Sequence, residues 1–111
     1  MTNTSQDPDH TPGATSLILA DSLDMTAAAP LKAQLLAARG TSLTLDASAV
    51  RRTGAQCLQV LLAARAAWRA DGLDWRIATA SEEFADAARL MGCPDLVADA
   101  LTPSDFAPLQ D

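Results

Sequence analysis

The feature that most limits the fold of this 111-residue chain is a strand-like segment followed by a helix-like segment, three times in succession. Short apolar runs over residues 16–20, 42–47 and 73–80 are typical of buried strands. Helix-like segments follow them over residues 25–40, 56–71 and 82–91. Strands that alternate with helices at this spacing predict a single α/β domain with a central sheet.

Residues at the ends of the helical segments support these boundaries. Thr26 and Ser81 are candidate N-caps, although Pro30 favours a later start of the first helix, near Ala28 or Ala29. Glycines end the three segments at positions 40, 72 and 92. In the longest helix a stripe of apolar residues predicts the core-facing side: Cys57, Leu61, Ala64 and Trp68. One more helical turn is expected after Pro94.

Charge and composition exclude several classes of function. The chain carries 8 basic and 14 acidic residues, a net charge of −6, which disfavours binding to a nucleic-acid backbone. No apolar run is long enough to span a bilayer, so membrane insertion is not expected. The N-terminal residues lack the pattern of a signal peptide, which indicates a cytoplasmic protein. Residues 1–14 are expected to form a disordered lead-in, residues 15–102 the domain, and residues 103–111 an acidic tail.

The chain offers few groups for catalysis or metal binding. Its two cysteines, Cys57 and Cys93, have no metal-ligand spacing, and its one histidine, His10, lies in the polar lead-in. No carboxylate pair, glycine-rich phosphate loop or Ser–His–Asp set is visible. Cys57 could be a reactive thiol at a helix N-terminus, but cysteine is also a common core residue, and core packing is the preferred interpretation. We therefore expect no enzyme, no cofactor and no metal.

Four segments in order resemble the STAS domain, the small module of bacterial anti-sigma-factor antagonists. They are "LDMTAAAPL", "LTLDASAV", "LQVLLAA" and "SEEFADAARLMG", and the resemblance runs from Leu17 to Gly92. It implies a STAS-type fold, with a central mixed β-sheet and helices packed mainly on one face. It also implies a non-catalytic role in protein binding.

The turn before the long helix departs from the pattern of that family. There the turn usually carries an aspartate, two small hydroxyl residues and a glycine, and a partner kinase phosphorylates the first hydroxyl. Counting back from Leu58 places that acceptor at Ala55, the aspartate at Gly54 and the glycine at Cys57. The resemblance therefore implies a docking surface that has lost its phosphorylation switch. Thr53 and Ser48 are the remaining hydroxyl residues near the turn.

The expected partner-binding residues come from two segments. The turn contributes six consecutive residues: Arg51, Arg52, Thr53, Gly54, Ala55 and Gln56. The family architecture places Asp24 and Met25, from the loop before the first helix, beside this turn. The alternative interpretation is a plain strand-to-helix turn with solvated arginines, with Asp24 serving only to start its helix.

The nature of the partner follows from a narrower resemblance. The segments "LTLDASAV", "LQVLLAARAAW" and "SEEFADAARLMG" resemble short STAS proteins attached to chemotaxis phosphorelays. That subgroup implies a chemotaxis histidine kinase or a response regulator as the partner. Three alternatives remain: an antagonist of a serine-kinase anti-sigma factor, a STAS subunit of a transporter ATPase, and a thiol enzyme that uses Cys57.

Overall fold

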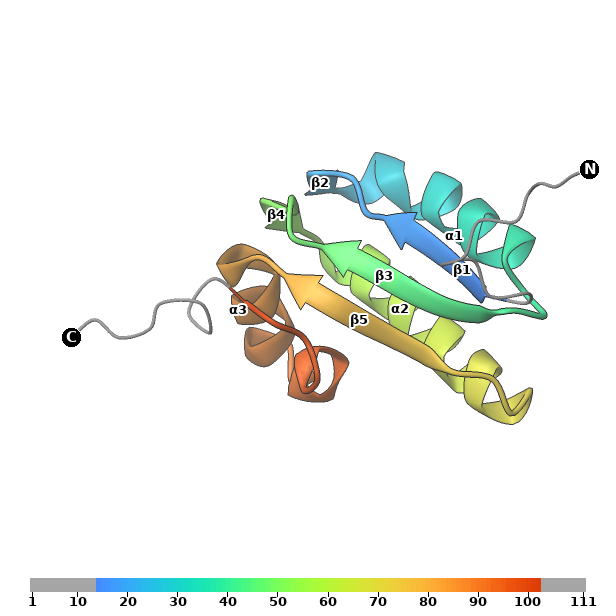
Figure 1. Ribbon diagram of the computed structural model, residues 1–111. Helices are drawn as coiled ribbons and strands as arrows, with labels where there is room; N and C mark the ends of the chain where they lie inside the picture. Colours follow the sequence, from blue (N-terminus) through green and yellow to red (C-terminus); the bar gives the residue numbers. More distant parts are fainter. Residues whose placement is uncertain (1–13, 103–111) are drawn as a thin grey trace, which may run out of the picture.

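The computed structural model describes residues 14–102, which form an α/β domain (Figure 1). The elements follow one another as β1 (Ala14–Ile18), β2 (Ser22–Leu23), η1 (Met25–Ala27), α1 (Ala28–Ala37), β3 (Ser42–Ala47), β4 (Arg52–Thr53), α2 (Ala55–Ala70), β5 (Trp75–Ala80), α3 (Glu82–Leu90) and η2 (Pro94–Val97). The expected lead-in, including His10, and the expected tail over 103–111 lie outside the described residues, except that Ala14 already begins β1.

The main sheet has three strands in the order β1-β3-β5, and both pairs are parallel. Leu45 lies at the centre of the sheet, opposite Leu17 on one side and Ile77 on the other. The register between β3 and β5 shifts after Leu45. The predicted α/β fold is confirmed, but the described strand pairs are all parallel where a mixed sheet was expected. Each connection between parallel strands must cross the sheet, and helices provide these crossovers.

Helices α1 and α2 cover one face of the sheet and lie behind it in Figure 1. The strand order advances in one direction along the chain, so crossovers of the same hand place both helices on the same face. The residues of β3 reflect this arrangement. Leu43, Leu45 and Ala47 are buried on the helix side, whereas the alternate residues of β3 are only half-buried. Helix α3 follows β5 at the edge of the sheet opposite β1 (Figure 1).

The predicted core stripe of the long helix is confirmed. Cys57 and Leu61 are fully buried in α2, Trp68 is 1% exposed and Ala64 is 9% exposed. The indole nitrogen of Trp68 is also hydrogen-bonded, because Nε1 donates to the backbone oxygen of Thr41 at 2.6 Å. The longest helix is therefore fixed to the sheet by aliphatic packing along its length and by one hydrogen bond near its C-terminus.

Most helix boundaries agree with the sequence signals. The Ser81 hydroxyl accepts a hydrogen bond from the Phe84 N–H at 3.0 Å and caps α3. Gly40, Gly72 and Gly92 follow the helices with φ values of 91°, 73° and 79°, a conformation that glycine adopts without strain. The expected turn after Pro94 is η2. The strand expected at 16–20 instead spans Ala14–Ile18, and the one expected at 73–80 begins at Trp75.

The start of the first helical segment differs from the expectation. Thr26 was the candidate cap, but Asp24 is the capping residue, and it caps the short helix η1. Helix α1 then begins at Ala28, one of the two positions that Pro30 favours. The Asp24 carboxylate lies two residues before Thr26 and accepts hydrogen bonds from both the N–H and the hydroxyl of Thr26. Thr26 is therefore the donor in this cap and not the capping residue.

Candidate functional site

The two segments expected to form the binding surface lie side by side, joined by a second, two-stranded sheet. Strands β2 and β4 pair in parallel, with Ser22 opposite Arg52 and Leu23 opposite Thr53. Just after this pairing, the Gly54 N–H donates a hydrogen bond to the Leu23 backbone oxygen at 2.8 Å. The sequence did not predict these two-residue strands. They bring Asp24 and Met25 beside the turn that runs from Arg51 to Gln56, as the family architecture implied.

We call this set of residues, Asp24, Met25 and Arg51–Gln56, the α2 N-terminal surface. Most of its side chains are exposed, and the Met25 side chain is 74% exposed. Thr53 and Gly54 are half-buried beneath them. A Cβ atom at position 54 would lie 3.4 Å from the Leu23 backbone oxygen, which is van der Waals contact, so the turn runs close against β2. The surface thus combines an exposed apolar side chain with charged and amide groups on a backbone fixed by hydrogen bonds.

Asp24 adds a fixed negative charge to this surface. Its carboxylate accepts hydrogen bonds from the Thr26 hydroxyl at 2.6 Å and from the Thr26 N–H at 2.9 Å. These bonds favour the ionised form and hold the pKa of Asp24 below its ordinary value. Asp24 is therefore ionised at neutral pH. Arg51 and Arg52 are exposed on the same surface, so the α2 N-terminal surface presents both positive and negative charge.

Cys57 is a core residue and not a surface thiol. Its side chain is fully buried, and Sγ donates a hydrogen bond to the Asp24 backbone oxygen at 3.4 Å. Burial raises the pKa of the Cys57 thiol, and the nearby Asp24 charge adds to this effect. A thiol that is neutral and inaccessible at neutral pH is a poor nucleophile. The structure supports the preferred interpretation of Cys57 as a packing residue.

The turn after β3 is held by Asp46. Its Oδ1 atom accepts hydrogen bonds from the Ser48 N–H at 2.9 Å and from the Thr79 hydroxyl at 2.7 Å. The bonds with Ser48, followed by the bond from Thr79, hold the pKa of Asp46 below its ordinary value. Asp46 thus fastens the end of β3 to β5 and fixes the backbone that leads toward Arg51.

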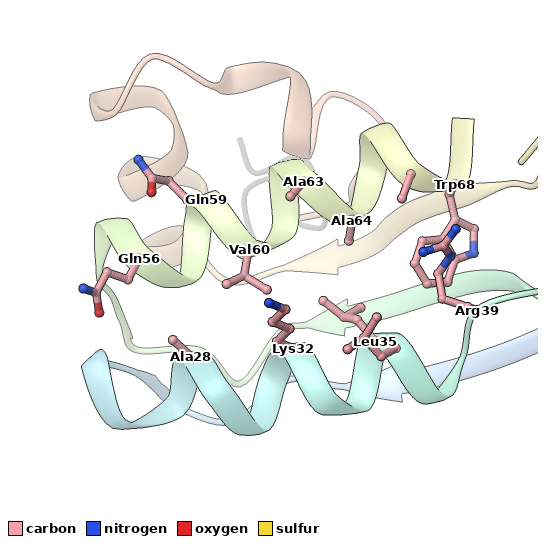
Figure 2. Close-up of a pocket in the computed structure, with 12 residues that line it drawn as sticks. Ala28, Lys32, Leu35, Arg39, Gln56, Gln59, Val60, Ala63, Ala64 and Trp68 are labelled. Carbon is pink, nitrogen blue, oxygen red and sulfur yellow. The ribbon is translucent and has the colours of Figure 1, made fainter. Parts of the chain in front are cut away.

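Two hollows flank the α2 N-terminal surface and divide its residues. Arg51 lines a hollow of about 310 Å³ at the carboxyl ends of the strands, with Asp21, Ser48, Ser81 and Glu83 among its other lining residues. Gln56 instead lines a groove of about 370 Å³ between α1 and α2 (Figure 2). The six residues of the turn are therefore contiguous in the chain but do not all face the same way.

The groove between α1 and α2 is the feature that sequence reasoning missed. Alanines and aliphatic side chains line most of it, together with Lys32, Arg39 and Trp68. The available signal was the composition of α1, "AAPLKAQLLA", which carries apolar residues on every side of the helix. A surface helix normally has one polar face, so this pattern indicates a helix covered on more than one side.

The described part of the chain shows no metal centre and no membrane span. Between residues 14 and 102, no group of three His, Cys, Asp or Glu side chains is arranged to hold a metal ion. Within the same range, each helix is too short or too polar to cross a bilayer.

Comparison with protein families identifies the fold. The family model described as "Mlab, STAS domain" matches residues 7–98, which include every described element from β1 to η2. The chain belongs to the STAS domain family. STAS domains are generally non-catalytic binding domains, so this one has a role in protein interaction or regulation. No curated protein and no solved structure is similar enough to the chain to count as a match.

Proposed function

We propose that this STAS domain is a non-catalytic regulator of a bacterial signalling pathway that binds its partner protein through the α2 N-terminal surface. The observation that carries the proposal is the β2–β4 pairing, which fixes Asp24 and Met25 beside the start of α2. A large exposed apolar side chain, here Met25, on a rigid backbone and flanked by charges is a common composition for a protein interface.

The proposed binding is not switched by phosphorylation of the turn. Ala55, at the position of the family acceptor, is the first residue of α2 and has no hydroxyl. The Thr53 hydroxyl oxygen is buried and has no hydrogen-bond partner, so a kinase could not reach it without local unfolding. Ser48 is exposed and shares a hollow with Arg51, but it precedes the turn and is not one of its six residues. The domain is thus proposed to bind constitutively, with regulation supplied by its partner.

The proposed partner is a chemotaxis histidine kinase or one of its response regulators, and the proposed place of action is the cytoplasm. The resemblance of three segments, including "LTLDASAV" and "SEEFADAARLMG", to STAS proteins of chemotaxis phosphorelays supports this choice. An anti-sigma factor with serine-kinase activity and a transporter ATPase are the alternative partners.

A binding assay with purified candidate partners and the Ala55→Glu variant tests the proposal. A carboxylate in the first turn of α2 is mildly favourable for the free protein, by about 0.3–1 kcal/mol, so folding is preserved. In a dry interface an unpaired carboxylate costs several kcal/mol, and each 1.4 kcal/mol weakens binding about tenfold. We expect Ala55→Glu to reduce partner affinity at least about a hundredfold while its melting temperature stays at or slightly above that of the wild type.

A matched variant controls for the added charge. Ala66→Glu places the same carboxylate on an exposed position of α2, three turns from the N-terminus, and should leave affinity unchanged. Arg51→Glu should weaken binding less, and in a salt-dependent way, as expected for a charge at the edge of an interface. Unchanged affinity of a folded Ala55→Glu protein would remove this surface from the binding site. Binding to the anti-sigma factor or to the transporter ATPase alone would replace the proposed partner.

A further inference from the structure

Helix α1 leaves an apolar side uncovered in the described structure. Of its ten residues, only Lys32 and Gln34 are polar. Leu31 and Leu35 are buried against the sheet, but Leu36 is 56% exposed, and the alanines at positions 29, 33 and 37 are also exposed. A helix that is apolar on most sides is normally packed on most sides. The exposed side of α1 therefore has the composition of a contact surface and not that of a solvated one.

The groove between α1 and α2 begins at this exposed side. Its walls include alanines from both helices, Ala28 from α1 and Ala63, Ala64 and Ala67 from α2, and these short side chains leave a volume of about 370 Å³. The two helices run side by side in the same direction (Figure 2). From Ala28 to Arg39 the groove is about 16 Å long at 1.5 Å per residue, which matches about three turns of another helix.

The charged residues of the groove are both basic, although the chain as a whole is acidic. Lys32 and Arg39 line it, and no aspartate or glutamate of the described part of the chain does. Arg39 is already neutralised: it bonds to the Asp71 carboxylate at 2.9 Å, and its guanidinium lies 5.7 Å from the centre of the Trp68 ring. Lys32 makes no ion pair among residues 14–102 and reaches from α1 toward Val60 in the middle of the groove (Figure 2). Its ammonium group therefore lies against apolar side chains of the groove, and no carboxylate of residues 14–102 pairs with it.

The form of the occupant follows from the groove walls. Both walls are α-helices whose backbone groups are bonded within the helix, so the groove offers no ladder for an added strand. A helix fits such a groove because it satisfies its own backbone groups and presents only side chains to the walls. The occupant must also cover alanine and leucine side chains and place a carboxylate near Lys32. A second copy packed groove to groove would bring the two Lys32 ammonium groups together and is disfavoured.

We propose that the groove between α1 and α2 binds an amphipathic helix of about three turns from a partner protein, with an apolar stripe against the alanines and an acidic side chain paired with Lys32. This site is separate from the α2 N-terminal surface, and among the residues of that surface only Gln56 lines the groove. A partner bound at the turn and a helix bound in the groove could occupy the domain at the same time.

Titration with two synthetic peptides, followed by amide chemical shifts of the full chain, tests the proposal. Each peptide is a stapled helix of about twelve residues with leucines at i, i+3, i+4 and i+7. One carries glutamates beside the leucine stripe, and its twin carries lysines at the same positions. The acidic peptide should give saturable shifts at groove residues such as Leu36 and Ala63 and none at Met25. The lysine peptide should bind about tenfold more weakly, or not at all.

Variants of single residues separate this site from the turn. Ala63→Phe fills the groove and should abolish the shifts, whereas Ala66→Phe adds the same ring to α2 outside the groove and should not. Lys32→Glu should weaken the acidic peptide about tenfold and strengthen the lysine peptide. Ala55→Glu should bind the acidic peptide like the wild type. The proposal for the groove and the proposal for the α2 N-terminal surface can therefore fail independently of each other.

Four results would overturn the proposal. Two concern the peptides: equal affinity of the domain for the acidic and the lysine peptide, or no amide shift at the highest concentration of the acidic peptide. The third is a dimer in sedimentation that Ala63→Phe dissociates, because a second copy would then fill the groove. The fourth is a change of the groove signals on removal of residues 103–111, because the chain's own segment would then occupy it.

Discussion

The thiol of Cys57 donates a hydrogen bond to the backbone oxygen of Asp24 at 3.4 Å. This contact ties the first turn of α2 to the residue that follows β2, 33 positions earlier in the chain. It lies beneath the α2 N-terminal surface, on the side that faces the core. The Cys57 side chain therefore helps to hold together the two segments of the proposed binding surface.

Cys57 should be protected from alkylation in the folded protein. It is fully buried and burial raises the pKa of its thiol, whereas Cys93 is half-buried. Iodoacetamide at pH 7.5 should modify Cys93 first and Cys57 more than about tenfold more slowly, because the thiolate is the reacting species and the folded core excludes the reagent. Peptide mass spectrometry over time measures both rates. In urea the two rates should converge, and fast modification of Cys57 in the native protein would revive the thiol-enzyme interpretation.

Truncation of a core leucine in α2 should be costly. Leu61 is fully buried, and Leu61→Ala should lower the free energy of unfolding by about 2–5 kcal/mol. Leu36→Ala is the matched control, because Leu36 is 56% exposed and its truncation should cost less than about 1 kcal/mol. Urea unfolding followed by tryptophan fluorescence gives both values. Similar costs for the two variants would mean that α2 does not face the sheet with its Cys57–Trp68 stripe.

Protonation of Asp46 should make the domain less stable in acid. Hydrogen bonds hold its pKa below the ordinary value of 3.8, so the ionised carboxylate stabilises the folded state at neutral pH. That contribution is present above the unfolded-state pKa and is lost as the pH falls through the lower folded-state pKa. The gap in unfolding free energy between wild type and Asp46→Asn should therefore narrow between about pH 5 and pH 2.

A second substitution checks that the hydrogen bonds are the cause. Thr79→Val removes the bond from the Thr79 hydroxyl to Asp46 and leaves the bond from Ser48. The difference in unfolding free energy between Thr79→Val and the wild type should also narrow over this pH range, but by a smaller amount than for Asp46→Asn. Urea unfolding at several pH values measures all three proteins. A gap that stays constant down to about pH 2 would show that Asp46 contributes nothing through its ionisation.

Local sequence signals were sufficient for most of the fold. The alternation of strands and helices, the Ser81 cap and the glycines after each helix follow from backbone preferences, which act within a few residues. The stripe from Cys57 to Trp68 follows from helical periodicity and is buried as predicted. These features do not depend on which segments of the chain meet in space.

The features that the sequence did not reveal depend on contacts between distant segments. The β2–β4 pairing joins Ser22 to Arg52, and neither two-residue segment carries a strand pattern of its own. The groove between α1 and α2 arises because short side chains from two different helices line it, Ala28 of α1 and Ala63 and Ala64 of α2 among them, and this cannot be deduced from either helix alone. The parallel arrangement of the sheet is likewise fixed by the crossovers and not by the composition of its strands.

The turn at the start of α2 should accept no phosphate in the wild-type protein and little after Ala55→Ser. Ala55 is exposed and begins α2, so a serine there would present its hydroxyl to solvent. Gly54 still lacks the carboxylate of the family pattern, and we therefore expect labelling well below one phosphate per chain. Incubation with ATP and an anti-sigma-type serine kinase, followed by intact-mass measurement, checks both proteins. The Thr53 hydroxyl is buried and should stay unmodified in each. Stoichiometric phosphate on Thr53 of the wild type would restore the switch that the sequence of this turn indicates is lost.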